Sequence, residues 1–357
     1  MPSDITYQDE LNQERTLRLR QIVNSLPNFC KEYFIGIEPT TSIRTRIAYA
    51  YDLSMFFEYL HENNPCFKQK SISSIKLDDL DSVDSSDIES FMEHLNFYLK
   101  PDKDNPDHML QFSNKNRGKA RKLSAIRSFY KFYYKRKKIK TNPASFVDMP
   151  KVHEKPIIRL EVDEVAKLLD IVESGRKLSP IQLKYQKFTR SRDMAILSLF
   201  LGTGIRVSEL VGINISDLDF DVNGFKVTRK GGNQVVLYFS DEVKKSIKDY
   251  LNDRKAIQPI AGNEDALFLS LQRKRMSVRS VETMVKKYTS LVTSIKKISP
   301  HKLRSTYGTN LYRETGDIYL VADVLGHKDV NTTRKYYAAI DDDKRRMAGK
   351  VVKLRDE

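Results

Sequence analysis

The sequence predicts a mainly α protein of two domains, the second of which also carries a small antiparallel sheet. In most segments the apolar residues recur at steps of three and four, the period of a helix that buries one stripe. The stretch 224–239 alternates instead and turns at Gly231 and Gly232, which is typical of a hairpin. The polar segment 141–156 contains three prolines and interrupts both periods. It is the expected linker.

The domain before the linker, residues 1–150, contains three helical patterns. They cover 43–60, 88–99 and 117–138, and the last has Leu123, Ile126 and Phe129 on one side and many lysines and arginines on the others. The stretches 65–87 and 101–116 are rich in Asp, Ser, Asn and Pro, which predicts loops. We therefore expect a helical domain with one cationic helix.

The second domain, residues 151–357, is expected to be α+β. Its hairpin at 224–239 lies among helical patterns at 161–172, 192–204, 241–255, 277–291, 301–315 and 318–325.

The charge of the chain favours a polyanionic partner. There are 62 Lys and Arg residues against 47 Asp and Glu, a formal net charge of +15. Such an imbalance puts nucleic acid ahead of a membrane surface, although solvated cationic faces are the plain alternative.

Membrane and secretory classes are disfavoured. No apolar run approaches the roughly 20 residues of a membrane span, and residues 1–14 are polar and carry acids. We expect neither a signal peptide nor an anchor. Cys30 and Cys66 are far apart and lack a metal-ligand spacing, which predicts reduced thiols in a cytoplasmic protein.

Four motifs suggest a function: TGIRVSEL (203–210), TRKGGNQ (228–234), HKLRSTYGTNL (301–311) and LGHKDVNTTRKYY (325–337). Together and in this order they resemble the tyrosine recombinase (phage integrase) family, most closely its Xer and transposon-integrase branches. The segments LSAIRSFYKFYY and TNPA before the linker resemble the last helix and exit of the family's core-binding domain. The resemblance implies a SAM-like helical core DNA-binding domain followed by a tyrosine-recombinase catalytic domain.

The resemblance also implies the catalytic residues. The nucleophile would be the tyrosine nine residues after the motif histidine. Mapped onto this sequence, the set is Arg206, Lys230, His301, Arg304, His327 and Tyr336.

The chemistry of strand cleavage agrees with these residue types. The two arginines suit the non-bridging oxygens of a phosphorane-like state, because a guanidinium makes paired, charge-assisted hydrogen bonds. His301 can accept the proton of a tyrosine hydroxyl, whose pKa is ordinarily near 10, and Lys230 can protonate the leaving 5′-oxygen. A phosphotyrosine conserves bond energy, so neither ATP nor any other cofactor nor a metal is expected.

Each residue also has a structural interpretation. Arg206 could cap a helix or pair with Glu209, which we interpret as orienting it, and His301 could cap its helix. His327 could be an ordinary buried histidine. Lys230 could be a surface charge, and a one-residue slip of the hairpin would put Arg229 in its place.

The cationic helix gives the candidate DNA contacts. It could be merely solvated, but beside a DNA-cutting domain it is expected to follow phosphates. The residues in question are Arg117, Lys119, Arg121, Lys122 and Arg127.

The sequence departs from the family pattern in two respects. Ser305 stands where family members often carry a second histidine after the arginine. The chain is also longer before about residue 40 and near 65–85 and 101–116, which we interpret as a lengthened DNA-binding half.

The expected activity is site-specific recombination of double-stranded DNA through a 3′-phosphotyrosyl intermediate and a Holliday junction. Integration, excision, inversion and dimer resolution stay open, as do accessory proteins. The resemblance implies a homo-tetramer on two duplexes, with a dimer or monomer left open for the free protein, and residues 344–357 are expected to dock into a neighbouring protomer. The alternatives are a type IB topoisomerase-like enzyme, a DNA-binding regulator on the same fold and a basic RNA-binding protein.

Overall fold

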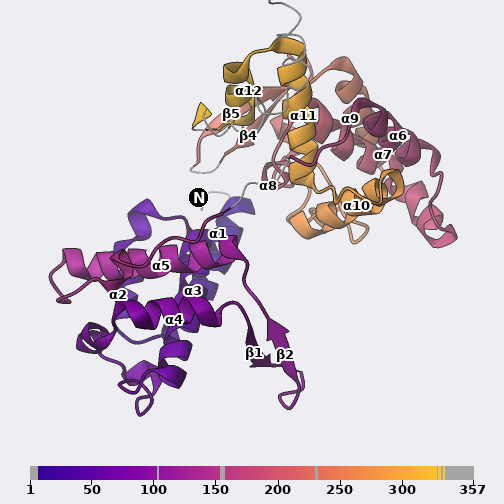
Figure 1. Ribbon diagram of the computed structural model, residues 1–357. Coiled ribbons are helices and arrows are strands. Elements are labelled where there is room, and N and C mark those ends of the chain that lie inside the picture. The colour runs from indigo at the N-terminus through magenta and orange to yellow at the C-terminus, as the bar shows by residue number, and fades with distance from the viewer. Residues whose placement is uncertain are drawn as a thin grey trace, which may run out of the picture. The chain divides into compact units, whose positions relative to one another are not determined.

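The computed structural model describes residues 7–102, 104–152, 157–229, 232–327, 329–330 and 333. The chain divides into two compact units, Met1–Glu154 and Lys155–Glu357, which are coloured indigo to magenta and magenta to yellow in Figure 1. The described residues are mostly helical and form two small antiparallel sheets. The predicted fold class is therefore confirmed.

The first unit is built from five described helices and a hairpin. They are α1 (Tyr7–Asn24), α2 (Cys30–Gly36), α3 (Ile43–Asn63), α4 (Ser85–His94), β1 (Tyr98–Pro101), β2 (Met109–Phe112) and α5 (Asn116–Lys135). Short 3-10 turns lie at Glu38–Thr40, Ile72–Ser74, Leu77–Ser82 and Pro143–Ser145.

Helices α3 and α5 form the centre of this unit. The Ser42 hydroxyl starts α3 by accepting a hydrogen bond from Thr45 N, as expected of an N-cap. The buried side of α3 carries Phe57 and that of α5 carries Phe129, whose rings meet edge to face with centroids 5.9 Å apart. The predicted apolar stripes of both helices are confirmed.

Other predictions for this unit were wrong. The helix predicted over 88–99 is α4, which begins at Ser85 and ends at His94. The Tyr98 ring stacks instead on Phe112 across the hairpin, with centroids 5.6 Å apart, so part of the predicted loop 101–116 is strand β2. Helices α1 and α2 were not predicted at all.

The second unit contains most of the elements that the sequence predicts. They are α6 (Val162–Ser174), α7 (Pro180–Thr203), α8 (Val207–Leu210), β3 (Leu218–Asp219), β4 (Gly224–Thr228), β5 (Gln234–Tyr238), α9 (Asp241–Arg254), α10 (Val278–Val292), α11 (Pro300–Thr315) and α12 (Ile318–Leu325). A 3-10 turn lies at Ile215–Asp217.

The predicted hairpin and its small sheet are confirmed. Strands β4 and β5 pair antiparallel with Val227 opposite Val235, and β3 adds a short third strand on the other side of β4. Helix α7 is longer than the predicted 192–204, because the Ser179 hydroxyl caps it by accepting from Gln182 N. Its C-terminal half packs against α9 and α11.

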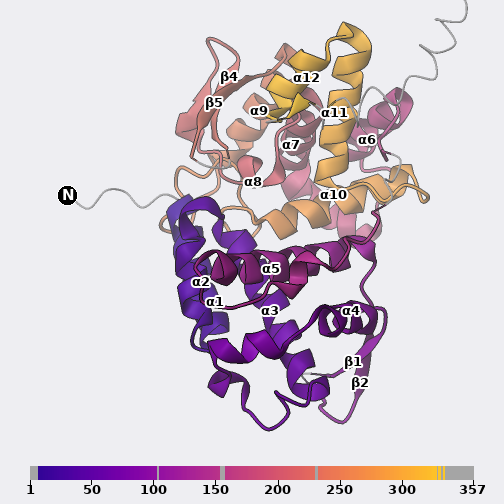
Figure 2. The same ribbon diagram turned by 60° about the vertical axis from the view of Figure 1, so that its left-hand side comes forward.

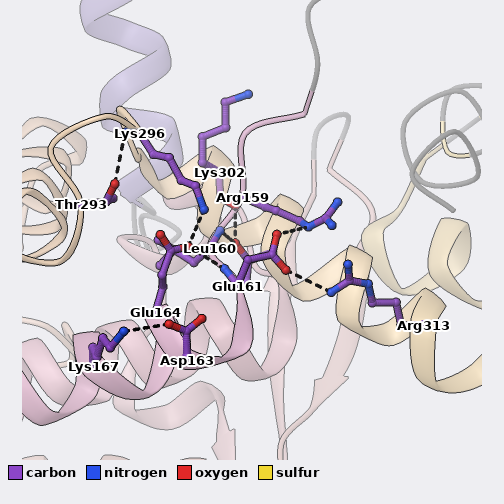
Figure 3. Close-up of polar contacts among 11 residues, drawn as sticks. Arg159, Leu160, Glu161, Asp163, Glu164, Lys167, Thr293, Lys296, Lys302 and Arg313 are labelled. Carbon is purple, nitrogen blue, oxygen red and sulfur yellow. Dashed lines mark hydrogen bonds and ion pairs between the residues drawn. The ribbon is translucent and has the colours of Figure 1, made fainter. Parts of the chain in front are cut away.

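The beginning of this unit is fastened to α11, as Figure 3 shows. Leu160 N donates to the buried Thr306 hydroxyl at 3.0 Å, and the Glu161 carboxylate pairs with Arg313 at 3.2 Å. Glu164 helps to start α6, because its carboxylate accepts a hydrogen bond from Glu161 N. The same carboxylate pairs with Lys296 at 2.5 Å. These bonds fix the helix that carries two of the predicted catalytic residues.

Candidate active site

Arg206 is held at the junction of α7 and α8. Gly204 ends α7 in the left-handed conformation (φ 62°), and a Cβ there would lie 2.5 Å from a carbon of the Tyr307 ring. The buried Glu209 accepts from the Arg206 backbone N–H at 3.1 Å and from its Nη1 at 2.7 Å. Pairing with Glu209 is thus present, and it orients the guanidinium.

Arg304 lies one turn inside α11 and is buried. Its Nη1 donates to Gly204 O at 2.5 Å, and its Nη2 donates to Leu325 O. Arg206 Nη2 also donates to Leu325 O, at 3.1 Å. The two guanidiniums therefore converge on the carboxyl end of α12, where the unsatisfied helix carbonyls favour positive charge.

His327 follows that helix end. Its Nδ1 lies 2.7 Å from the Thr333 hydroxyl, and its backbone N–H donates to Ala322 O. The pKa of His327 is lowered to about 4, chiefly by burial and then by the positive charges of Arg304 and Arg206, with smaller effects of His301 and Arg229. The imidazole is neutral at physiological pH.

His301 is the second residue of α11. Ser299 occupies the N-cap position, so the helix-capping alternative for His301 is not seen. Partial burial lowers the pKa of this histidine, followed by the positive charges of Arg304, Lys302 and Arg206. This imidazole is therefore also biased toward its neutral form.

The structure thus brings together the four predicted catalytic residues that it describes, namely Arg206, His301, Arg304 and His327. The other two, Lys230 and Tyr336, lie outside the described residues, as does Tyr337.

Two residues of this region escaped prediction. Thr333 lies six positions after His327, and nothing in that spacing identifies it as the partner of the ring. Arg229 was considered only as a slipped substitute for Lys230, yet its Nη2 donates to Val324 O at 2.8 Å. Both contacts depend on the return of the chain to α12, which no local pattern reveals.

The candidate DNA contacts on α5 differ in their surroundings. Arg117 is exposed, and Lys119 Nζ binds Asn96 Oδ1 at 2.5 Å. Arg121 keeps about half of its side chain exposed while it pairs with the buried Asp52.

The remaining two cations of α5 serve the first unit internally. Lys122 is buried and pairs with Asp52 at 3.2 Å. Arg127 Nε donates to Ala144 O at 3.1 Å, and its Nη2 donates to Val147 O. These bonds join α5 to α3 and to the segment that leaves the unit.

The described part of the chain has neither a cluster of metal ligands nor a helix suited to a membrane. It contains no group of three or more His, Cys, Asp or Glu side chains arranged to hold a metal ion. None of its helices is long and apolar enough to cross a membrane.

Two arginines converging beside two neutral histidines suit a phosphodiester, and comparison with known proteins identifies the class. Residues 159–343 match the phage integrase family. The chain is 35% identical over 331 residues to tyrosine recombinase XerC of Caldanaerobacter subterraneus subsp. tengcongensis, covering 89% of this chain and 84% of the relative. It is 30% identical over 317 residues to XerC of Chlorobaculum tepidum, covering 85% and 88%.

Solved structures agree in fold. One is the XerH site-specific recombinase bound to palindromic difH substrate, with a TM-score of 0.64 and 16% identity over 87% of this chain and 79% of that one. Another is the Tn1549 transposon integrase in complex with circular intermediate DNA, with a TM-score of 0.62 and 18% identity over 91% and 99%.

These similarities define a DNA-cleaving and rejoining enzyme. The chain belongs to the phage integrase family and is an Xer-like tyrosine recombinase that carries out site-specific DNA recombination. The predicted family, enzyme class and function are confirmed, and neither a topoisomerase nor a non-catalytic regulator is favoured.

Proposed function

We propose that this recombinase cleaves DNA by attack of Tyr336 on the scissile phosphate, with a 3′-phosphotyrosyl intermediate and a Holliday junction on the pathway. The observation that carries the proposal is the convergence of Arg206 and Arg304 on one point, Leu325 O, beside His301 and His327. Guanidiniums fixed in this way can bind the phosphate oxygens with little reorganisation, which is the main source of electrostatic catalysis.

The two histidines have separate roles in this proposal. His301 accepts the proton of the Tyr336 hydroxyl, for which its lowered pKa is an advantage, since a protonated imidazole cannot act as a base. The Thr333 hydroxyl lies 2.7 Å from Nδ1 of His327. The proposal has this hydroxyl donate to Nδ1, so that the proton of the neutral ring is on Nε2 and faces a phosphate oxygen.

The bond changes then balance. The Tyr336 oxygen forms a bond to phosphorus as the bond from phosphorus to the 5′-oxygen breaks, and Lys230 protonates that oxygen. Rejoining reverses each step when a 5′-hydroxyl from the partner strand attacks the phosphotyrosine. No other reactant enters.

DNA binding is proposed for both halves of the chain. Residues 1–150 act as the core DNA-binding domain, in which Arg117, Lys119 and Arg121 contact phosphates. Lys122 and Arg127 are proposed to support α5, because their side chains already bind the protein itself.

The assembly and setting follow the family. The XerH and Tn1549 structures are complexes with DNA, and we propose a double-stranded recombination site as partner and four copies of this chain on two duplexes. Residues 344–357 would join neighbouring copies. The free thiols of Cys30 and Cys66 support a cytoplasmic location.

A suicide half-site tests the proposal, since a nick beside the scissile phosphate lets the cleaved fragment diffuse away and traps the covalent complex. The wild-type chain and Tyr337→Phe should give a DNA adduct that survives denaturing electrophoresis. Tyr336→Phe should bind the same half-site with unchanged affinity and give none. An adduct from Tyr336→Phe would contradict the assignment of the nucleophile.

A further inference from the structure

Arg229 connects the hairpin of the second unit to the end of α12. It directly follows β4, and its backbone closes the hairpin, since Arg229 N donates to Asn233 O at 2.8 Å. Its side chain reaches Val324 O through Nη2 at 2.8 Å and Asp323 O through Nη1 at 3.5 Å. Figures 1 and 2 both show the hairpin beside α12.

The guanidinium of Arg229 rests on Gly326, the residue before His327. Gly326 adopts the left-handed conformation (φ 59°), and a Cβ there would lie 2.3 Å from Arg229 Nη1. A side chain at position 326 would force the Arg229 guanidinium to move. Glycine at this position therefore leaves room for that guanidinium against the turn that leads into His327.

The position of the Arg229 guanidinium has an energetic cost. Arg229 Nε is buried and has no hydrogen-bond partner among the described residues. A buried donor without a partner costs about 1–3 kcal/mol. An exposed lysine or serine would avoid that cost at this position, so the observed arrangement suggests a role other than stability.

Three arginines from different parts of the second unit thus bind the same turn. Arg206 binds Leu325 O and Gly326 O, Arg304 binds Leu325 O, and Arg229 binds the two preceding carbonyls. All four carbonyls lie between Asp323 and Gly326. The bonds from Arg229 thus hold the Asp323 and Val324 carbonyls, and those from Arg206 and Arg304 hold Leu325 and Gly326.

We propose that Arg229 is a positioning residue of the cleavage reaction, which fixes the Asp323–Gly326 turn and thereby the place of the His327 ring. The inference rests on the proposed role of His327. The Arg229 charge also contributes to the lowered pKa of that ring, after burial, Arg304, Arg206 and His301.

A double-variant cycle on the full chain tests this. The rate of adduct formation on the suicide half-site is measured at saturating protein for Arg229→Ala, His327→Ala and the combined variant. Misplacing a reacting group by about 1 Å can cost on the order of a hundredfold in rate, so Arg229→Ala should be roughly 10- to 100-fold slower, with half-site affinity within about threefold of wild type. The combined variant should be no more than about threefold slower than His327→Ala.

Lys226→Ala is the matched control. It removes a cation from β4, the strand that Arg229 follows, and its side chain is half exposed and only weakly paired with Asp217 at 3.9 Å. It should cleave at the wild-type rate. Should Arg229→Ala lose its cooperative thermal transition, the same cycle is run with Arg229→Lys, which keeps the charge but has a single donor nitrogen.

Each other outcome has a definite meaning. The inference would be overturned if the loss of rate in the combined variant equalled the product of the two single losses. A wild-type rate for Arg229→Ala would also overturn it. Rescue of Arg229→Ala by a half-site with sulfur at the 5′-bridging position would also overturn it, because a thiolate leaves without a proton and Arg229 would then be the acid. A wild-type rate for His327→Ala would instead refute the proposed function.

Discussion

His301 and His327 are biased toward their neutral forms by the surroundings that would bind DNA. Burial is the largest cause for both rings, and the two converging arginines add to it. A phosphate placed between these groups would oppose the arginine charges and raise both pKa values. We therefore expect bound DNA to weaken the bias of both rings toward their neutral forms.

The same shifts predict how stability depends on pH. Both histidines have a folded pKa below the ordinary 6.5, so the unfolded chain binds more protons as the pH falls from about 6.5 toward 4. The free energy of unfolding should fall in that window, by at most about 1.4 kcal/mol per pH unit for His327 and by less for His301, whose side chain is exposed and screened by solvent. Urea unfolding of wild type and of the His301→Gln/His327→Gln variant measures this. The variant should show the shallower slope, and equal slopes would argue against these shifts.

Glu209 is expected to act through Arg206. Glu209→Gln keeps the shape but loses the charge of a buried carboxylate that accepts two bonds from Arg206. Charge-assisted bonds of this kind contribute about 1.5–3 kcal/mol, so adduct formation should slow about 10- to 100-fold. Asp163→Asn is the control, because Asp163 and its partner Lys167 are both exposed and such pairs contribute little. Equal rates for both variants would show that Glu209 does not orient the arginine.

At the scale of elements, local patterns predicted the helices that pack on one continuous face. They failed where a short apolar run had a distant partner. The apolar spacing of α4 continues to Leu99, which predicted helix there. Residues Tyr98–Pro101 are instead strand β1, which pairs with β2 across the hairpin. Strand β3 has only two residues, which is too short for any period. Its existence depends on β4 being next to it.

The hydrogen bond from Leu160 N to Thr306 on α11 gives a stability prediction with a matched control. Thr306→Val removes the buried oxygen that accepts from Leu160 N, and the stranded N–H should cost about 1–3 kcal/mol of unfolding free energy. Thr309→Val makes the same change on the same helix, where the buried hydroxyl has no partner among the described residues. It should be neutral or stabilising. Denaturant unfolding decides, and equal losses would contradict the proposed importance of this bond.

At the scale of the molecule, the order of the four motifs predicted which distant residues would meet. Arg206 and His327 are more than a hundred positions apart in the sequence, yet both lie within the charge environment of Arg304. The sequence could not predict that Lys122 would be buried against Asp52, because a cation on a helix looks the same whether it faces solvent or a carboxylate. It did not identify Thr333 or Arg229, because their contacts depend on the return of the chain to the end of α12.

Both halves are predicted to contact the same DNA. Residues 1–150 and 151–357, produced separately and checked for folding by circular dichroism, should each bind the site more weakly than the whole chain. Each should also show a shallower dependence of log affinity on log salt, since the slope reports about 0.9 per phosphate contact. Titrations at several salt concentrations test this. An isolated half with the affinity and slope of the full chain would refute the two-sided contact.

The central claim is that strand cleavage runs through a covalent bond to Tyr336. Tyr336 and Tyr337 are adjacent in the sequence, and the spacing of nine residues from His327 selects Tyr336 as the proposed nucleophile. The decisive measurement is mass spectrometry of the peptide that stays attached to a trapped half-site after proteolysis. We predict a phosphotyrosine at Tyr336, on the 3′ end of the cleaved strand. Attachment at Tyr337, or cleavage without any attached peptide, would contradict the account.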